Sequence, residues 1–279
     1  MMGSVDTRSP VITSMANPRV KAAIALRDRR ARDEADLTIV DGAREVRRAL
    51  DAGVRVTEAF VCERLLAGID ARAAFDRLLA DRIGVTSVNE AVFERVAFGG
   101  RAEGLVVVIR RPSTALTDLA IPPDPLLVVI EAVEKPGNVG AVMRSADGAG
   151  ASAVIAASPA TDLFNPNAIR ASSGTIFGLS LAAAPTDEVV SWLRANDIRI
   201  VTARVDAERD YTEANLTGPL AVVLGAESEG LTPAWAGPDV TPVRIPMAGT
   251  ADSLNVSIAA AVLAYEARRQ RRSQGSPQP

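Results

Sequence analysis

The chain has 279 residues, about twice the usual length of one domain, so one large or two ordinary domains are expected. Hydrophobic residues make up 48% and charged residues 23%, a composition typical of a folded core and not of a disordered chain. The sequence contains no histidine, which excludes His-based catalytic triads and His metal ligands. Its single cysteine, Cys62, excludes an internal disulfide and a Cys-cluster zinc site.

The hydropathy pattern predicts neither a membrane span nor a secretory signal. No apolar run is long enough to cross a bilayer, and the N-terminus lacks a charged-then-apolar stretch. We therefore expect a cytoplasmic protein that binds no metal and does not associate with a membrane.

Charge is unevenly distributed, although the net charge of −3 does not by itself indicate a nucleic-acid partner. Basic residues outnumber acidic ones in the first 112 residues, and the reverse holds in the remainder. Within the basic part, a cluster opposed only by Asp28 comprises Arg19, Lys21, Arg27, Arg29, Arg30 and Arg32. A solvated helix face and an RNA-binding edge both fit this run, since the planar guanidinium suits phosphate.

The first part of the chain is predicted to form a flexible tail at 1–10 and a small α/β domain at 11–112. Short apolar runs predict strands at 37–40, 59–62, 85–88 and 105–109. Amphipathic stretches predict helices at 43–52 and 70–80, and a shorter helix that begins at Asn89, a good N-cap residue.

A proline-rich stretch at 113–125 is predicted to be a linker, because prolines oppose regular structure. The second domain is then expected at 126–272, followed by a disordered tail at 273–279. Its expected strands are 126–133, 153–157, 198–202, 220–224 and 241–245, and its expected helices are 138–149, 166–173, 186–196 and 253–271. This alternation predicts a mainly parallel sheet with helices on both faces.

Ligands of parallel α/β sheets bind beyond the carboxyl ends of the strands, where the loop 134–150 is expected. Pro136 and Gly137 predict a turn, Asn138 is a candidate helix cap, and Arg144 follows on the helix body. A plain cap and a surface arginine are the alternative interpretations. Neither phosphate-loop pattern is present, which disfavours an ordinary ATPase or nicotinamide site.

Two later segments are expected at the same edge of the sheet. In 224–232, Gly225 and Gly230 bracket Glu227 and Glu229, and carboxylates at a strand end either bind something cationic or repel each other. A plain glycine-rich turn is the alternative. In 245–272, Ser253 and Asn255 open a long helix of small residues, while its apolar positions are assigned to core packing.

These three segments resemble the signature motifs of the SpoU (TrmH) family of RNA 2′-O-ribose methyltransferases, in the SPOUT superfamily. The matching stretches are NVGAVMR at 138–144, GAESEG at 225–230 and IPMAGTADSLNVSIAAA at 245–261. The first domain is similar to the family's N-terminal substrate-binding domain of the L30e fold, through 17–30 and 39–50.

The resemblance implies a SPOUT domain with a trefoil knot, an L30e-like RNA-binding domain before it, S-adenosyl-L-methionine as cofactor and a homodimer. Carried over by position, the residues implied to contact the cofactor are Leu224, Gly225, Ile245, Met247 and Leu254. Those implied to line the reaction centre are Asn138, Arg144, Glu227, Ser253 and Asn255.

The function implied is S-adenosylmethionine-dependent 2′-O-ribose methylation of RNA, with 23S ribosomal RNA favoured. The alternatives are a transfer-RNA 2′-O-methyltransferase, a non-catalytic RNA-binding protein on the same scaffold, and a small-molecule enzyme of ordinary doubly wound fold. Because a guanidinium stays protonated, Arg144 is expected to stabilise the developing alkoxide and not to act as a free base.

Overall fold

A computed structural model of the chain describes residues 10–98 and 103–273. The tails predicted at 1–10 and 273–279 lie almost entirely outside these residues. Contacts divide the chain into two compact units, one of Met1–Pro112 with Phe164–Arg170 and one of Ser113–Leu163 with Ala171–Pro279.

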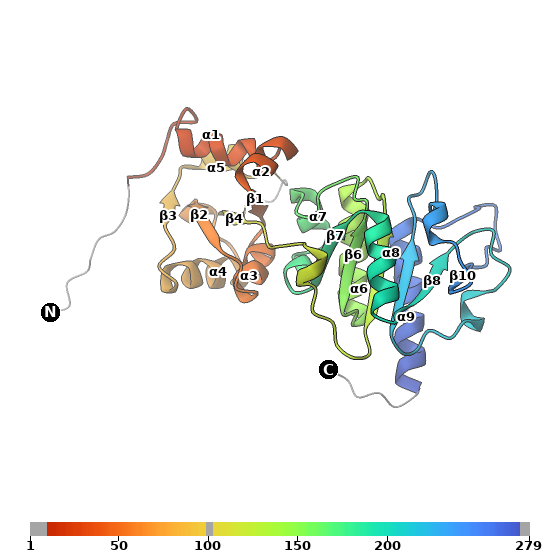
Figure 1. The fold of residues 1–279 in the computed structure, drawn as a ribbon. Helices are drawn as coiled ribbons and strands as arrows, with labels where there is room; N and C mark the ends of the chain where they lie inside the picture. The colour runs from red at the N-terminus through yellow and green to blue at the C-terminus, as the bar shows by residue number, and fades with distance from the viewer. Residues whose placement is uncertain (1–9, 99–102, 274–279) are drawn as a thin grey trace. The chain divides into compact units, whose positions relative to one another are not determined.

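The first unit is built on a four-stranded sheet in the order β1-β4-β2-β3 (Figure 1). Its strands are β1 (Leu37–Asp41), β2 (Val56–Val61), β3 (Val85–Ser87) and β4 (Leu105–Arg110). Strand β4 pairs antiparallel with both β1 and β2, whereas β2 and β3 run parallel. The structure therefore confirms the predicted small α/β domain, and every predicted strand of this unit is present.

Helices cover both faces of this sheet. They are α1 (Pro18–Ala25), α2 (Arg29–Ala35), α3 (Ala43–Asp51), α4 (Ile69–Ala80) and α5 (Glu90–Val96). Apolar residues of α1 and α5 share one core cluster with the sheet, whereas α3 and α4 pack together on the opposite face (Figure 1). The predicted cap of α5 is confirmed, since the Asn89 Oδ1 accepts a hydrogen bond of 2.9 Å from the Val92 amide.

The second unit contains a six-stranded sheet in the order β10-β8-β9-β5-β6-β7, with every neighbouring pair parallel. Its strands are β5 (Leu126–Glu131), β6 (Ala153–Ala157), β7 (Ser180–Ala184), β8 (Arg199–Ala203), β9 (Leu220–Leu224) and β10 (Val240–Val243). The predicted mainly parallel sheet is confirmed, and the trefoil knot stays a prediction. Strand β7 was not predicted, because the run SLAAA lacks the β-branched residues that mark a strand.

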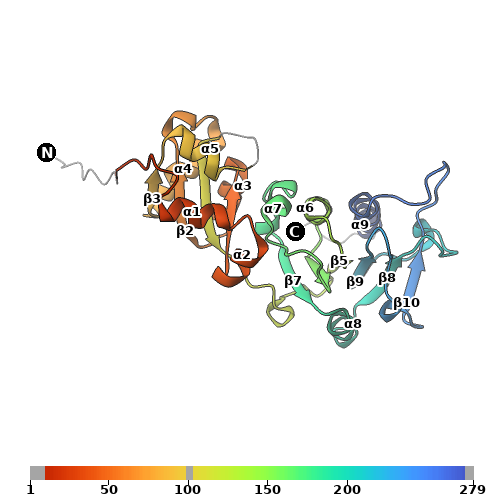
Figure 2. The same ribbon diagram turned by 90° about the horizontal axis from the view of Figure 1, so that it is seen from above.

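Helix α8 (Thr186–Ala195) covers one face of the second sheet, and α6 (Pro136–Ala149) and α9 (Val256–Ser273) cover the other (Figure 2). A further helix, α7 (Pro166–Ala171), belongs almost entirely to the first unit by its contacts. The predicted linker 113–125 packs on the second unit, because Leu116, Leu119 and Ile121 are partly buried against its core. No helix within the described residues is long and apolar enough to span a bilayer.

Two helix starts differ from the sequence prediction, and both differences matter for the site. Helix α6 begins at Pro136, so Asn138 lies in its first turn and does not cap it. Helix α9 begins only at Val256, so Ser253 and Asn255 lie in the loop before it. The amide side chains of Asn138 and Asn255 are therefore available for contacts across the chain.

Candidate active site

A cavity of about 750 Å³ opens at the carboxyl ends of β8, β9 and β10. Its walls come from the segments that follow these three strands and from the start of α9. All the residues implied to contact the cofactor line this one cavity: Leu224, Gly225, Ile245, Met247 and Leu254. The volume lies within the usual range of small-molecule sites.

Glycine is required at position 225 because the chain turns back on itself there. A Cβ at Gly225 would lie 2.2 Å from the carbonyl carbon of Gly230, closer than any real contact. Gly230 itself adopts a φ of 69°, and its amide donates to the Ala226 carbonyl at 2.9 Å. The two glycines therefore close a tight loop that forms one wall of the cavity.

The charge of the cavity wall suits a cationic ligand that also carries apolar parts. Arg204 is paired with Asp206 at 2.9 Å, which neutralises both groups. Among the described residues, Glu229 and Asp252 line the cavity with no ion-pair partner. Arg244 also lines the cavity and is paired with Asp210 at 2.8 Å. Most of the remaining wall is apolar, so a sulfonium group next to a nucleoside fits the chemistry of the donor set.

Three distant segments meet at Glu227, on the rim of this cavity. Its Oε1 accepts a hydrogen bond of 3.1 Å from the Asn138 amide and another from the Asn255 amide. The Asn255 amide also lies 3.3 Å from the Asn138 Oδ1. On the other side, Lys135 Nζ lies 3.0 Å from Glu227 Oε2. Asn138, Glu227 and Lys135 also line a second, smaller cavity of about 230 Å³.

The ionised form of Glu227 is favoured by these donors. The hydrogen bond from Lys135 is the main cause that holds the pKa of Glu227 below its ordinary value, with smaller contributions from the Lys135 charge and the Asn138 amide. Desolvation acts in the opposite direction and is outweighed. Glu227 is therefore a carboxylate well below neutral pH.

The remaining predicted reaction-centre residues, Ser253 and Arg144, lie outside the cluster of Asn138, Glu227 and Asn255. Ser253 lines the large cavity. Arg144 lies on α6 with an exposed side chain, and it has no hydrogen-bond or ion-pair partner among the described residues. It is thus not part of the Asn138–Glu227–Asn255 cluster within one chain.

Lys135 was not predicted as a site residue. The available signal was its position, since it is one of only two lysines in the chain and directly precedes the Pro136 turn.

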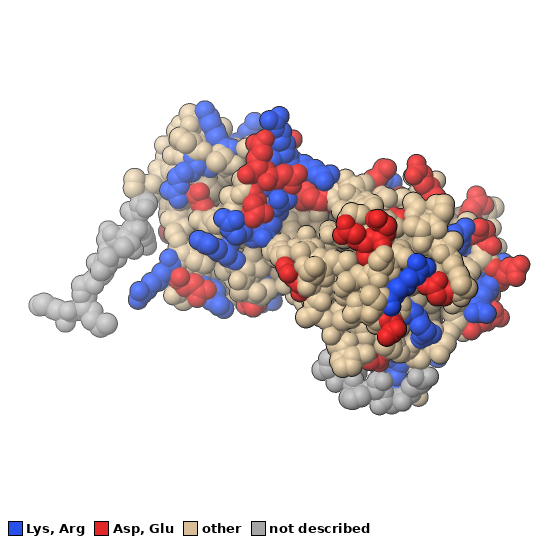
Figure 3. Space-filling view, in the orientation of Figure 1, with Lys and Arg blue, Asp and Glu red and all other residues tan. Residues whose placement is uncertain are grey.

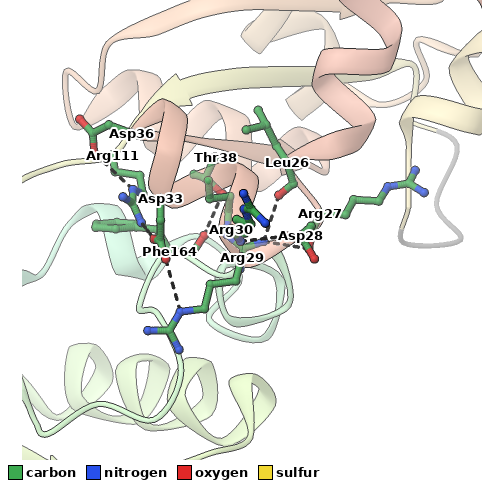
Figure 4. Close-up of polar contacts among 11 residues, drawn as sticks. Leu26, Arg27, Asp28, Arg29, Arg30, Asp33, Asp36, Thr38, Arg111 and Phe164 are labelled. Carbon is green, nitrogen blue, oxygen red and sulfur yellow. Dashed lines mark hydrogen bonds and ion pairs between the residues drawn. The ribbon is translucent and has the colours of Figure 1, made fainter.

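Two arginines of the basic cluster in the first unit form hydrogen bonds with backbone carbonyls of the same unit (Figure 4). Arg32 is only 1% exposed, and its Nη1 donates to the Leu26 and Arg27 carbonyls at 3.0 and 2.8 Å. Arg27 in turn donates from Nη2 to three carbonyls at the end of α5, those of Arg95, Val96 and Ala97. Arg32 therefore cannot reach RNA, and the expectation that it binds RNA is wrong.

The other five cluster residues, Arg27 included, are exposed at the surface. Arg19 pairs with Glu58 at 2.7 Å, Arg29 with Asp33 at 3.6 Å and Arg30 with Glu34 at 2.7 Å, but each basic side chain is at least half exposed. Lys21 is exposed as well. Figure 3 shows the same mixture of basic and acidic side chains over the visible face of this unit. Exposed ion pairs of this kind are weak, so a phosphate can compete for the arginines.

No group of three or more potential metal ligands occurs within residues 10–98 and 103–273.

Comparison with known proteins agrees with the geometry. Residues 125–265 match the SpoU rRNA Methylase family, and residues 17–106 match the MRM3-like substrate binding domain. The chain belongs to the SpoU rRNA methylase family. This SpoU chain is 26% identical to the 23S rRNA (guanosine(2553)-2′-O)-methyltransferase of Bacillus subtilis, over 92% of its own length and 98% of that protein.

Two further relatives of the SpoU chain are informative. It is 36% identical to the 23S rRNA (uridine(2479)-2′-O)-methyltransferase of Streptomyces viridochromogenes, although the match spans only 60% of each protein. Its fold is similar to the crystal structure of an AdoMet-bound rRNA methyltransferase from Sinorhizobium meliloti. That similarity has a TM-score of 0.83 and 30% identity over 92% of this chain and 97% of the other.

Replacing Lys135 tests the electrostatics of the site. We expect Lys135→Met to raise the pKa of Glu227, because its strongest hydrogen-bond donor and nearest positive charge are lost. In the wild type, ionised Glu227 stabilises the fold above its unfolded-state pKa, and this contribution disappears as the pH falls through the lowered pKa. Carboxyl-carbon NMR titration measures the shift, with Lys21→Met as control. An unchanged Glu227 titration in Lys135→Met would contradict the assignment.

Proposed function

We propose that the protein transfers a methyl group from S-adenosyl-L-methionine to a ribose 2′-hydroxyl of 23S ribosomal RNA. The observation that carries the proposal is the direct contact of Asn138, Glu227 and Asn255 at the rim of a cavity suited to a cationic ligand. The 23S rRNA methyltransferase names of the Bacillus subtilis and Streptomyces viridochromogenes relatives support the choice of RNA. A substrate of this kind supports a cytoplasmic location for the enzyme, which cell fractionation tests.

The cofactor would be held by the residues around the large cavity, Leu224, Gly225, Ile245, Met247 and Leu254. When bound, S-adenosylmethionine supplies an electrophilic methyl group on a positively charged sulfur. The AdoMet-bound structure of the Sinorhizobium meliloti relative supports this assignment. Glu229 and Asp252 place negative charge on the same wall, which favours a cationic ligand.

The chain's own part in the reaction is orientation and charge stabilisation. Asn138 and Asn255 hold the Glu227 carboxylate in place, and we assign this group to orienting the ribose at the cavity rim. Ser253, on the wall of the same cavity, is assigned a similar orienting role. Arg144 presents an exposed cation, which can stabilise an alkoxide as it forms but cannot serve as a base at neutral pH.

The activity assay compares methyl transfer from labelled S-adenosylmethionine to 23S rRNA and to transfer RNA. Arg144→Ala should lower transfer to 23S rRNA by about a hundredfold or more while cofactor affinity is kept, because only the stabilisation of developing charge is lost. Calorimetry with S-adenosylmethionine is the control for intact binding.

Three other results would contradict parts of this proposal. Near-normal transfer by Arg144→Ala refutes the role of this residue. Transfer confined to transfer RNA favours the alternative substrate. Failure of the wild type to bind the cofactor favours a non-catalytic RNA-binding protein.

RNA selection is assigned to the first unit, through the exposed residues Arg19, Lys21, Arg27, Arg29 and Arg30. Arg19, Lys21, Arg29 and Arg30 are the four whose charged groups do not donate to the carbonyls at the end of α5. Changing these four to Gln should weaken RNA binding and flatten its salt dependence, because fewer counterions are released. Fluorescence anisotropy over a range of salt concentrations measures both effects, and S-adenosylmethionine affinity should not change.

A matched control removes the same charge elsewhere in this unit, by changing Arg64, Arg72, Arg77 and Arg82 to Gln. Equal losses of RNA affinity in the two quadruple variants would show that the net charge matters and the α1–α2 edge does not.

We also propose that the protein acts as a homodimer. Ile258 and Tyr265 of α9 are each about half exposed, at 52% and 51%, and Tyr265 lies against Gly148 of α6. Exposed large apolar side chains on a helix that packs against α6 favour burial against a second copy. Such an interface would include the helix that carries Arg144.

Ile258→Glu should convert the dimer into monomers, because it would bury an unpaired charge in the interface. Analytical ultracentrifugation measures the mass. Leu79→Glu, at an equally exposed position on α4, is the control and should leave the assembly intact. A wild-type chain that sediments as a monomer at micromolar concentration rules the dimer out.

A further inference from the structure

A buried carboxyl group that the proposed mechanism does not use lies at the carboxyl end of β5. Glu131 is only 1% exposed. Burying such a group costs free energy unless hydrogen bonds compensate for the lost hydration. Its hydrogen-bond partners therefore indicate its role in the structure.

Glu131 accepts three hydrogen bonds from two different parts of the second unit. Its Oε2 accepts from the Thr232 backbone amide at 2.8 Å, and its Oε1 accepts from the Thr232 hydroxyl at 2.8 Å. The third donor is the Thr186 hydroxyl at the start of α8, also at 2.8 Å from Oε1. Thr186 is tied further to Ser158, whose Oγ accepts from the Thr186 amide at 3.0 Å.

Thr232 ends the loop that forms a wall of the large cavity. The cavity is lined by every residue from Leu224 to Leu231, and Thr232 follows immediately. At its beginning the loop is constrained by the close approach of Gly225 to Gly230. Glu131 therefore anchors the other end of the loop to the central strand β5, through a backbone amide as well as a side chain.

We propose that Glu131 is a positioning residue for the cofactor, which sets the place of the 225–231 wall by holding Thr232. The inference rests on the proposed cofactor site, and adds to it a residue outside the three sequence motifs. Groups behind a site that lock its wall by hydrogen bonds commonly control affinity without contacting the ligand.

Two Thr→Val variants separate positioning from simple stabilisation. Each removes one hydroxyl donor to the same Glu131 oxygen, but Thr186 is buried whereas Thr232 is exposed. If Glu131 only stabilises the fold, Thr186→Val should be at least as harmful as Thr232→Val in every measurement. If it positions the wall, Thr232→Val should weaken S-adenosylmethionine binding about tenfold, whereas Thr186→Val lowers Tm and leaves the affinity unchanged.

The measurements are calorimetric affinity for S-adenosylmethionine, KM and kcat, Tm, and hydrogen–deuterium exchange of 225–231 in the cofactor-free protein. Thr232→Val should raise KM for the cofactor with kcat kept, and should speed exchange in this loop. Equal affinities for the two variants, or losses that follow Tm alone, overturn the proposal. A wild type that does not bind the cofactor refutes the proposed function, while the exchange rates still decide whether Glu131 holds the loop.

Variants of Glu131 itself give a second test. In Glu131→Gln, the amide oxygen can accept from the Thr232 amide, and the amide nitrogen can donate to both hydroxyls, so cofactor affinity should stay near that of the wild type. Glu131→Leu removes all three bonds and should weaken affinity more than Thr232→Val does. Wild-type affinity in a folded Glu131→Leu protein overturns the proposal. If this variant does not fold, the comparison of Thr186→Val with Thr232→Val tests whether Glu131 positions the wall.

Discussion

The site depends on one set of contacts, those that join Asn138, Glu227 and Asn255. A carboxylate at the end of a strand, on a wall that already carries acidic groups, is stabilised in its ionised form by nearby hydrogen-bond donors and cations. The two amides and Lys135 provide those donors. Because Asn138 lies in the first turn of α6 and Asn255 directly precedes α9, the same hydrogen bonds fix two helix starts against the loop after β9.

The parallel sheet brings these segments together in the first place. When all strands run the same way, the loops after them leave at one edge, and residues from different loops meet there. The loop 225–231 is then held from two sides. Exposed Glu227 binds the helix starts at the cavity rim, and buried Glu131 holds Thr232 behind the wall. The cavity is thus shaped by hydrogen bonds to two carboxyl groups with opposite exposures.

Charge in the first unit illustrates how burial changes the meaning of a sequence pattern. The basic residues between positions 19 and 32 look alike in sequence, yet the fold uses them differently. Buried Arg32 and exposed Arg27 donate to carbonyl groups at helix ends, whereas the Arg30 side chain pairs, within the described residues, only with Glu34. The charge that can meet a nucleic acid is therefore smaller than the count of basic residues indicates.

The sequence by itself determined the strands with continuous apolar runs, the mainly parallel direction of the strands in the second unit, the Asn89 cap and the three motif segments. Those features depend on how neighbouring residues partition between water and core, which local patterns report. It did not determine β7, the start of α6, the roles of Arg32 and Lys135, or the partners of Glu131. These were decided by the tertiary structure, because their hydrogen-bond partners lie across the fold: Asn138 and Glu227 are 89 positions apart, and Glu131 and Thr232 are 101 apart.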